Sequence, residues 1–259
     1  MTDDDRHLIP TINYQHLLEE VVPNRTAEEF AKCRAIMQSE WFAMYVKRLE
    51  DLGYDNDGDG IFYEWGTFVY VVDHTLDSVK RDRWWVMHRD DTRIVVVHGF
   101  STPTAENRDD KRLQWHGHSI IREFGESVHK YPFDKGHYIA HSLGGHIDNG
   151  IFAQRRAINR GWSDLGKKFR AMEIYAQKNP GTFVFSRPIY GDGTLHPFFL
   201  EYGVLRADWT WWIEVFPNRY TYMPYSGQKC WTEWFRRYIE FETEKQKRRE
   251  ERSVQIQQK

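Results

Sequence analysis

The first part of the chain has a helical hydrophobic pattern, and a strand pattern follows it. Thr26 and Glu29 have the spacing of a capping box, and apolar residues then recur at helical intervals, so the sequence predicts a helix over 26–52. Aromatic and β-branched residues dominate the next stretch. They predict strands at 61–73, 83–88 and 93–98, paired as an antiparallel sheet.

The second half of the chain begins with a segment that has no clear period. Residues 131–149 are rich in glycine and histidine, which predicts a functional loop. Helices are predicted at 150–160 and 163–178, with a break at Gly161 and with Ser163 as the second N-cap. Further predicted elements are strands near 182–190 and 200–216 and a charged amphipathic helix from about Thr232 onward.

This order of elements predicts an α+β protein with a central antiparallel sheet flanked by helices. A chain of 259 residues is long enough to bury a core of its own. The predicted organisation is an N-terminal helical region over 1–60, one central domain over 61–216 and a charged C-terminal helix over 217–259.

Composition excludes several classes of protein. No apolar run approaches the length of a membrane span, and the acidic start MTDDDRHLIP differs from a secretory signal, so we expect no membrane contact. The expected location is the cytoplasm, or the outside by a route that needs no signal peptide. Cys33 and Cys230 are too few for a disulfide framework or a cysteine-rich zinc site.

Charge is unevenly distributed, although the net charge is only −2. Residues 151–190 carry a net charge of +6. This block is either a solvated helical face or a surface that binds phosphate. Its charged residues are Arg155, Arg156, Arg160, Lys167, Lys168, Arg170, Lys178 and Arg187, with Asp164 and Glu173 as the acidic members.

Two short motifs point to other chemistry. The run Asp55 to Gly60 alternates carboxylates before a glycine as a calcium loop does, but Gly66 stands where the bidentate glutamate belongs, which favours a solvated turn. The run His141 to Gly145 resembles a nucleophile elbow, and Val95 to Phe100 resembles an oxyanion-hole strand. An α/β-hydrolase-type esterase using Ser142 is therefore one alternative.

A second motif overlaps the first. It comprises Asp134-Lys135-Gly136-His137, Asn149 with Gln154, Asn159-Arg160-Gly161 and Phe169 to Glu173. In this order it resembles the DNA/RNA non-specific endonuclease family, the ββα-metal or His-Me finger nucleases, and in particular a bacterial subgroup. Lys135 stands where the family has arginine. The resemblance covers about residues 130–205.

The resemblance implies a ββα-metal core and a metal-dependent hydrolysis of DNA or RNA. His137 would be the general base, because a neutral imidazole can accept a proton from water near neutral pH. Asn159 would hold Mg²⁺, or Mn²⁺, through its amide oxygen, and Glu173 would bind the waters of the metal. Contacts to nucleic acid would fall mainly on the backbone, without sequence specificity.

Four further residues complete the predicted site. Arg160 and Arg170 are candidates for binding the substrate phosphate, while Asp134 and Gln154 are expected to hold the reactive groups in place. Tryptophans that either stack on bases or belong to the core are Trp84, Trp85, Trp209, Trp211 and Trp212. An inhibitor protein or a second copy of the chain are candidate partners.

The sequence is also compatible with two functions of different kinds. Seven histidines lie between His98 and His146, His116 and His118 among them, and such a cluster is also found in zinc hydrolases. A nuclease fold that has lost catalysis and only binds nucleic acid or a partner is the second of these functions.

Overall fold

The fold is known from a computed structural model of the chain. The structure describes residues 9–51, 60–73, 93–102, 133–146, 150–191 and 197–218. All of these residues belong to one compact unit, Thr2–Tyr220. The calcium-type run at 55–59, the strand predicted at 83–88 and the C-terminal helix lie outside the described residues.

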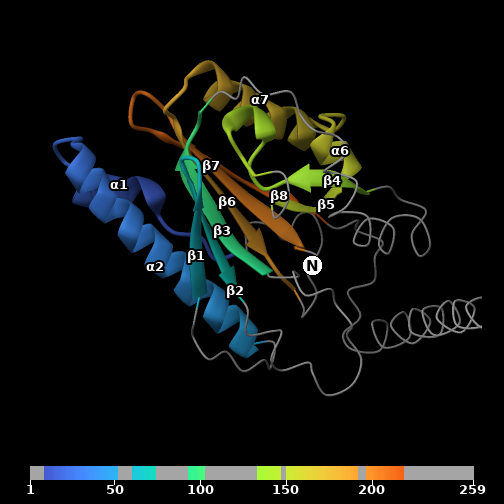
Figure 1. The fold of residues 1–259 in the computed structure, drawn as a ribbon, viewed down its shortest axis with the longest axis horizontal. Coiled ribbons are helices and arrows are strands. Elements are labelled where there is room, and N and C mark those ends of the chain that lie inside the picture. Colours follow the sequence, from blue (N-terminus) through green and yellow to red (C-terminus); the bar gives the residue numbers. More distant parts are fainter. Residues whose placement is uncertain are drawn as a thin grey trace, which may run out of the picture. The chain divides into compact units, whose positions relative to one another are not determined.

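A six-stranded antiparallel sheet forms the centre of this unit (Figure 1). Its strand order is β1-β2-β3-β6-β7-β8, so the chain leaves the sheet after β3 and returns at β6. The α+β class predicted from the sequence is confirmed. The strands are β1 (Gly60–Trp65), β2 (Phe68–Asp73), β3 (Arg93–Phe100), β6 (Phe183–Ile189), β7 (Phe199–Leu205) and β8 (Trp211–Pro217).

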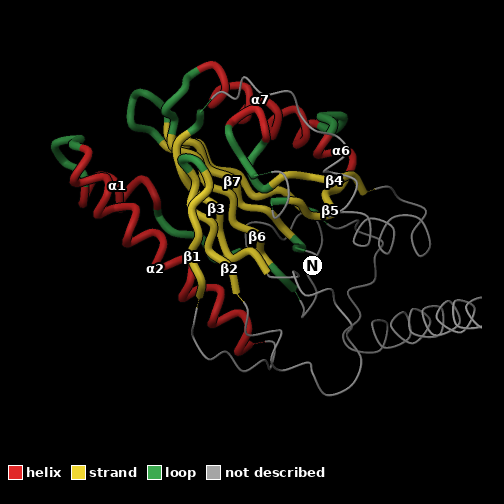
Figure 2. The backbone as a smooth tube through the Cα atoms, viewed as in Figure 1, coloured by secondary structure: helices red, strands yellow, loops and turns green. Residues whose placement is uncertain are grey.

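One face of the sheet is covered by two helices, α1 (Tyr14–Val21) and α2 (Ala27–Asp51) (Figure 2). The predicted capping box of α2 is confirmed, because Thr26 and Glu29 each accept a hydrogen bond from the other's backbone N–H. Trp41 of α2 is fully buried against the Phe185 ring of β6. The N-terminal helices therefore share a hydrophobic core with the sheet.

A buried ion pair also joins this face to the N-terminal segment. Arg187 of β6 and Glu201 of β7 lie opposite each other and form an ion pair at 2.5 Å. The Tyr14 hydroxyl donates to Glu201 at 2.9 Å and accepts from the Trp41 indole at 2.8 Å. The desolvation cost of burying this ion pair is offset because each charged group has additional hydrogen-bond partners.

The opposite face carries a small two-stranded sheet and the remaining helices. These elements are β4 (Phe133–His137), the 3₁₀ turn η2 (His141–Leu143), β5 (Ile151–Arg155), α6 (Arg156–Asn159) and α7 (Asp164–Lys178). Phe169 of α7 packs on Tyr202 and Phe216 of the sheet. None of the helices in the described ranges is long and apolar enough to span a membrane.

Several predicted boundaries are wrong, each for a local reason. The strand expected over 61–73 is a hairpin, because Gly66 takes a left-handed φ of 59° between β1 and β2. The strand expected over 200–216 is likewise two strands joined by a turn. The helix expected over 150–160 begins as strand β5, and the loop expected over 131–149 contains β4, because these two short segments pair with each other.

Candidate functional site

Strands β4 and β5 form an antiparallel pair, and α6 follows β5 without a loop. The pairing places Asp134 opposite Gln154 and His137 opposite Ile151. Gly136 leaves room for the Gln154 side chain, since a Cβ on this glycine would meet Gln154 Oε1 at 2.4 Å. The sequence order strand, strand, helix thus becomes a hairpin with a helix at its open end.

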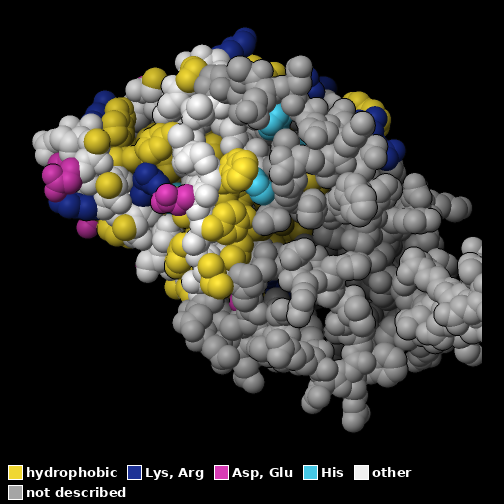
Figure 3. All heavy atoms as spheres, in the orientation of Figure 1, with side chains coloured by type: hydrophobic (Ala, Val, Ile, Leu, Met, Phe, Trp, Pro, Cys, Tyr) yellow, Lys and Arg dark blue, Asp and Glu magenta, His cyan; other side chains and the backbone are white. Residues whose placement is uncertain are grey.

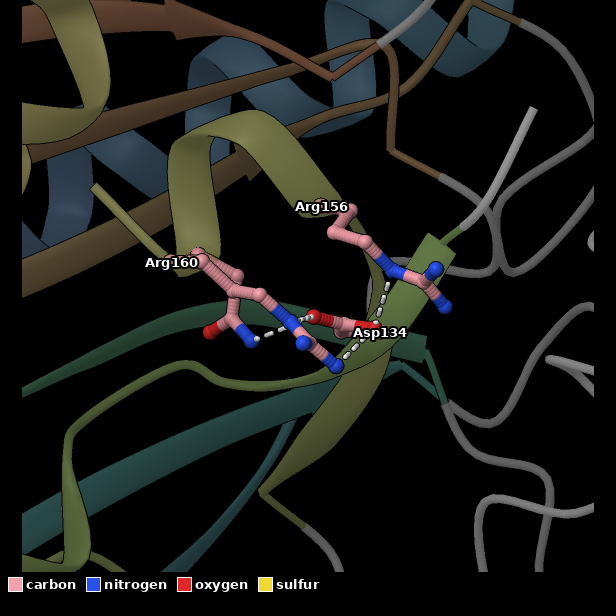
Figure 4. Close-up of polar contacts among 4 residues, drawn as sticks. Asp134, Arg156 and Arg160 are labelled. Atoms are coloured by element: carbon pink, nitrogen blue, oxygen red, sulfur yellow. Dashed lines mark hydrogen bonds and ion pairs between the residues drawn. The ribbon is translucent and has the colours of Figure 1, made fainter. Parts of the chain in front are cut away.

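Asp134 is the centre of the polar contacts in this element (Figure 4). One carboxylate oxygen accepts from Arg156 Nε at 2.7 Å, and the other accepts from Arg160 Nε at 2.5 Å. Burial alone would raise the pKa of Asp134, but the hydrogen bonds from Arg160 and Arg156 outweigh it and hold the pKa below its ordinary value. Asp134 is therefore a carboxylate at neutral pH and fixes both arginines.

Asn159 lies at the end of α6 and joins the same cluster. Its Nδ2 donates to Asp134 Oδ2 at 3.4 Å. Because the amide nitrogen faces the carboxylate, the amide oxygen is directed away from Asp134. The Asn159 side chain is half-buried, so part of its surface is in contact with solvent.

The structure does not join His137 to this cluster. His137 ends β4 three residues after Asp134, and alternation along a regular strand turns successive side chains to opposite faces. No hydrogen bond or ion pair among the described residues links His137 to Asp134 or Asn159. About 10 Å of strand backbone separates His137 from Asp134, at roughly 3.3 Å per residue.

Gln154 is almost fully buried beside Asp134, at 2% exposure. Neither its amide nitrogen nor its amide oxygen has a hydrogen-bond partner within the described residues. Burying an amide without hydrogen-bond partners costs free energy. The Gln154 amide is therefore expected to bind a polar group other than the described residues, such as an ordered water.

Glu173 occupies a different environment on α7. Its electrostatic neighbours among the described residues are Arg170 and the fully buried Tyr202 of β7. Burial raises the pKa of Glu173 to about 7, and the charge of Arg170 opposes this only in part. The structure thus places Glu173 beside Tyr202 and does not bring it into contact with Asp134 or Asn159.

Arg170 belongs to α7, and its side chain reaches the turn between α6 and α7. Gly161 has a left-handed φ of 69° there, and a Cβ on it would meet Arg170 Cδ at 3.4 Å. The predicted break at Gly161 and the predicted N-cap at Ser163 are both confirmed, since Ser163 Oγ accepts from Gly166 N. In the space-filling view, basic side chains lie along the margin over α6 and α7 (Figure 3).

Asn218, just after β8, fastens β5 to the rest of the unit. Its Oδ1 accepts from Arg155 N at 2.7 Å, and its Nδ2 donates to Ala153 O at 2.8 Å. No pattern in the sequence indicates Asn218, and Arg156 is indicated only as one member of the basic block 151–190. The position of Arg156 one helical turn before Arg160 could have indicated its place on the same face, whereas nothing near Asn218 in the sequence points to β5.

The surroundings of Ser142 do not have the geometry of a nucleophile elbow. Ser142 is exposed within the 3₁₀ turn, and no described residue from 138 to 143 has a positive φ. The sheet is antiparallel, unlike that of an α/β-hydrolase. His98 belongs to the run that resembles an oxyanion-hole strand, but it is buried, and its Nε2 is hydrogen-bonded to Gln38 at 2.8 Å. Burial, together with the charge of Arg34, lowers the pKa of His98 to about 3.

No group of three or more His, Cys, Asp or Glu side chains that could hold a metal occurs within the described ranges. His116 and His118, on which the zinc-hydrolase alternative depends, lie outside those ranges.

Comparison with known proteins adds little. No protein-family model matches the chain, and no curated protein matches it. A solved structure of the Sda1 nuclease with a bound zinc ion is similar over 63% of this chain and 76% of the other, with 17% identity and a TM-score of 0.32. At that TM-score the likeness supports no conclusion about the fold or the function.

Proposed function

We propose that the chain is a metal-dependent, sequence-non-specific nuclease that hydrolyses phosphodiester bonds of DNA or RNA. The observation that supports this most is the Asp134 cluster. One carboxylate orients Asn159 and two arginines on and just after the short helix α6, and that helix follows a hairpin whose other strand ends at His137.

The residues fit a hydrated Mg²⁺ or Mn²⁺ ion. Asn159 offers a neutral amide oxygen directed away from Asp134, and the buried Gln154 amide offers hydrogen-bonding groups to bound water. Magnesium keeps several waters and needs few protein ligands, which agrees with so small a donor set. When bound, the ion would neutralise charge that develops on the phosphate oxygens.

His137 supplies the base in this proposal. A neutral imidazole accepts the proton of an attacking water near neutral pH. Arg160 and Arg170 contribute positive charge that attracts and holds the phosphodiester.

The test is cleavage of plasmid DNA and of RNA by the full chain with Mg²⁺ or Mn²⁺. His137→Ala and Asn159→Ala should each lower the rate by at least about 100-fold, since a general base alone contributes that much. His16→Ala is the matched control, because His16 is largely exposed on α1. Chelation by EDTA should abolish cleavage.

Ser142→Ala separates this proposal from the esterase alternative. The serine variant should cleave nucleic acid at the wild-type rate, and the wild-type chain should not hydrolyse simple esters. Loss of activity in the serine variant alone would overturn the proposal. Intact nucleic acid after incubation of a chain that binds it would instead favour a binding module without catalysis.

A further inference from the structure

Trp162 is more exposed than any other large hydrophobic side chain that the structure describes, at 64%. It follows Gly161 directly, at the turn between α6 and α7. The guanidinium carbon of Arg160 lies 5.2 Å from the centre of its ring. An exposed indole beside a cation is a common arrangement in sites that bind nucleic acid, since every base has a face that can stack.

The surroundings of Trp162 are fixed by contacts already described. Arg160 is held by two hydrogen bonds to Asp134, and Arg156 is held by one. The stem of Arg170 lies against Gly161. Arg160 therefore stands against the indole, and Arg156 and Arg170 belong to the same pair of helices, with a single carboxylate between Arg156 and Arg160.

The arginines retain donors for a ligand. Arg156 uses only Nε toward Asp134, and Arg160 uses Nε and Nη2. Within the described residues the other Nη groups of Arg156 and Arg160 have no acceptor. Guanidinium donors in a fixed orientation match the geometry of phosphate oxygens.

We propose that this turn is a subsite for single-stranded nucleic acid. The Trp162 indole stacks on one unpaired base, and Arg156 and Arg160 bind the phosphates that flank it. Inside a duplex both faces of a base are covered by its neighbours, so the indole reaches only unpaired bases. The inference rests on the proposed nuclease function and names its preferred substrate class.

The experiment measures binding without cleavage, in EDTA, by fluorescence anisotropy of labelled oligonucleotides. The three probes are a DNA single strand, the same strand with abasic sites throughout, and its duplex. Trp162→Ala should weaken single-strand binding about tenfold or more, since stacking on an aromatic ring contributes that much per base. Abasic and duplex binding should change less than about twofold, and Trp162→Phe should restore most of the loss.

Arg156→Ala should weaken binding to all three probes, because it removes a phosphate contact, and should lower the salt dependence of single-strand binding. Arg206→Ala is the matched control, since Arg206 also lies over an indole, that of Trp212. It should leave all three dissociation constants unchanged. Equal single-strand affinity in Trp162→Ala and the wild-type chain, or an equal loss on the abasic strand, would overturn the subsite.

Failure of the subsite is distinguishable from failure of the nuclease proposal. Normal single-strand affinity in Trp162→Ala, with plasmid cleavage by the wild-type chain, would overturn the subsite and leave the nuclease. Binding that depends on Trp162 in a chain that never cuts nucleic acid would support the subsite and overturn the nuclease.

Discussion

Asp134 and Glu173 are carboxyl groups whose pKa values are shifted in opposite directions. For Asp134, burial is outweighed by the hydrogen bonds from Arg160 and Arg156, so it stays ionised well below neutral pH. For Glu173, burial dominates and raises the pKa to about 7. At neutral pH Asp134 is therefore ionised, whereas Glu173 is close to its own titration point.

The raised pKa of Glu173 makes the stability of the chain depend on pH. A carboxyl with a higher pKa when folded contributes stability that is full below its unfolded value, about 4.3, and that is lost as pH rises through about 7. The shift corresponds to at most about 3 to 4 kcal/mol. Because Glu173 keeps some surface in solvent, we expect roughly 2 kcal/mol.

Glu173→Gln removes the titrating group, so the variant should gain this stability relative to the wild-type chain at pH 8 and lose the advantage at pH 4. Urea unfolding at both pH values measures the difference. An equal difference at the two pH values would show that Glu173 does not titrate between them.

At the scale of elements, the crossing of α6 and α7 depends on small residues. Gly161 turns the chain, Ser163 caps α7, and Gly166 allows the two helices to approach each other. A Cβ on Gly166 would lie 2.3 Å from the Ala157 carbonyl oxygen, which is backbone and cannot rotate away. The position of Trp162 and Arg160 therefore depends on a close helix contact.

Gly166→Ala should lower the free energy of unfolding by about 1 to 3 kcal/mol, the usual cost of overpacking. It should also weaken nucleic-acid binding, because α6 must shift. Lys167→Ala, next to it and exposed, is the control and should change stability by less than about 0.5 kcal/mol. Wild-type stability in the glycine variant would mean that the helices separate without cost.

At the scale of the whole molecule, charge is segregated although the net charge is only −2. The basic side chains of α6 and α7 lie along one margin (Figure 3), and residues 151–190 carry a net charge of +6, so the remainder of the sequence is on balance acidic. Long-range attraction of a polyanion to such positive charge weakens as ions screen it.

Binding to nucleic acid should therefore fall steeply with salt. The logarithm of the association constant should decrease linearly with the logarithm of salt concentration, by about 0.7 per phosphate contact on a single strand. A titration in EDTA from low to moderate salt measures the slope. A slope near zero would contradict an electrostatic surface on α6 and α7.

Sequence reasoning predicted the long elements well because their patterns are local. The capping box of α2, the Gly161 break and the Ser163 cap depend on neighbouring residues, and all are present. The hydrophobic pattern missed the hairpin of β4 and β5, which only the family resemblance implied as part of a ββα core, because two five-residue strands obtain their stability from each other across a long loop. Arg156 and Asn159 approach Asp134 because β4 and β5 pair. The motif therefore predicted Asp134 and Asn159 as site residues, but it did not predict the hydrogen bonds between these side chains.

Asn218 gives β5 what a neighbouring strand would give, a hydrogen-bond acceptor for one amide and a donor for one carbonyl. Because β4 and β5 form a separate sheet among the described strands, the hydrogen bonds of the hairpin can open locally while those of the six-stranded sheet remain intact. Asn218→Ala should therefore speed amide hydrogen exchange in 133–137 and 151–155 and leave β3 and β6 protected, which mass spectrometry of deuterated peptides can measure. If amide exchange became faster in all strands together, the hairpin would be part of one cooperative unit. If it became faster in the hairpin alone, the side-chain amide of Asn218 would control how often the hairpin of the candidate site opens.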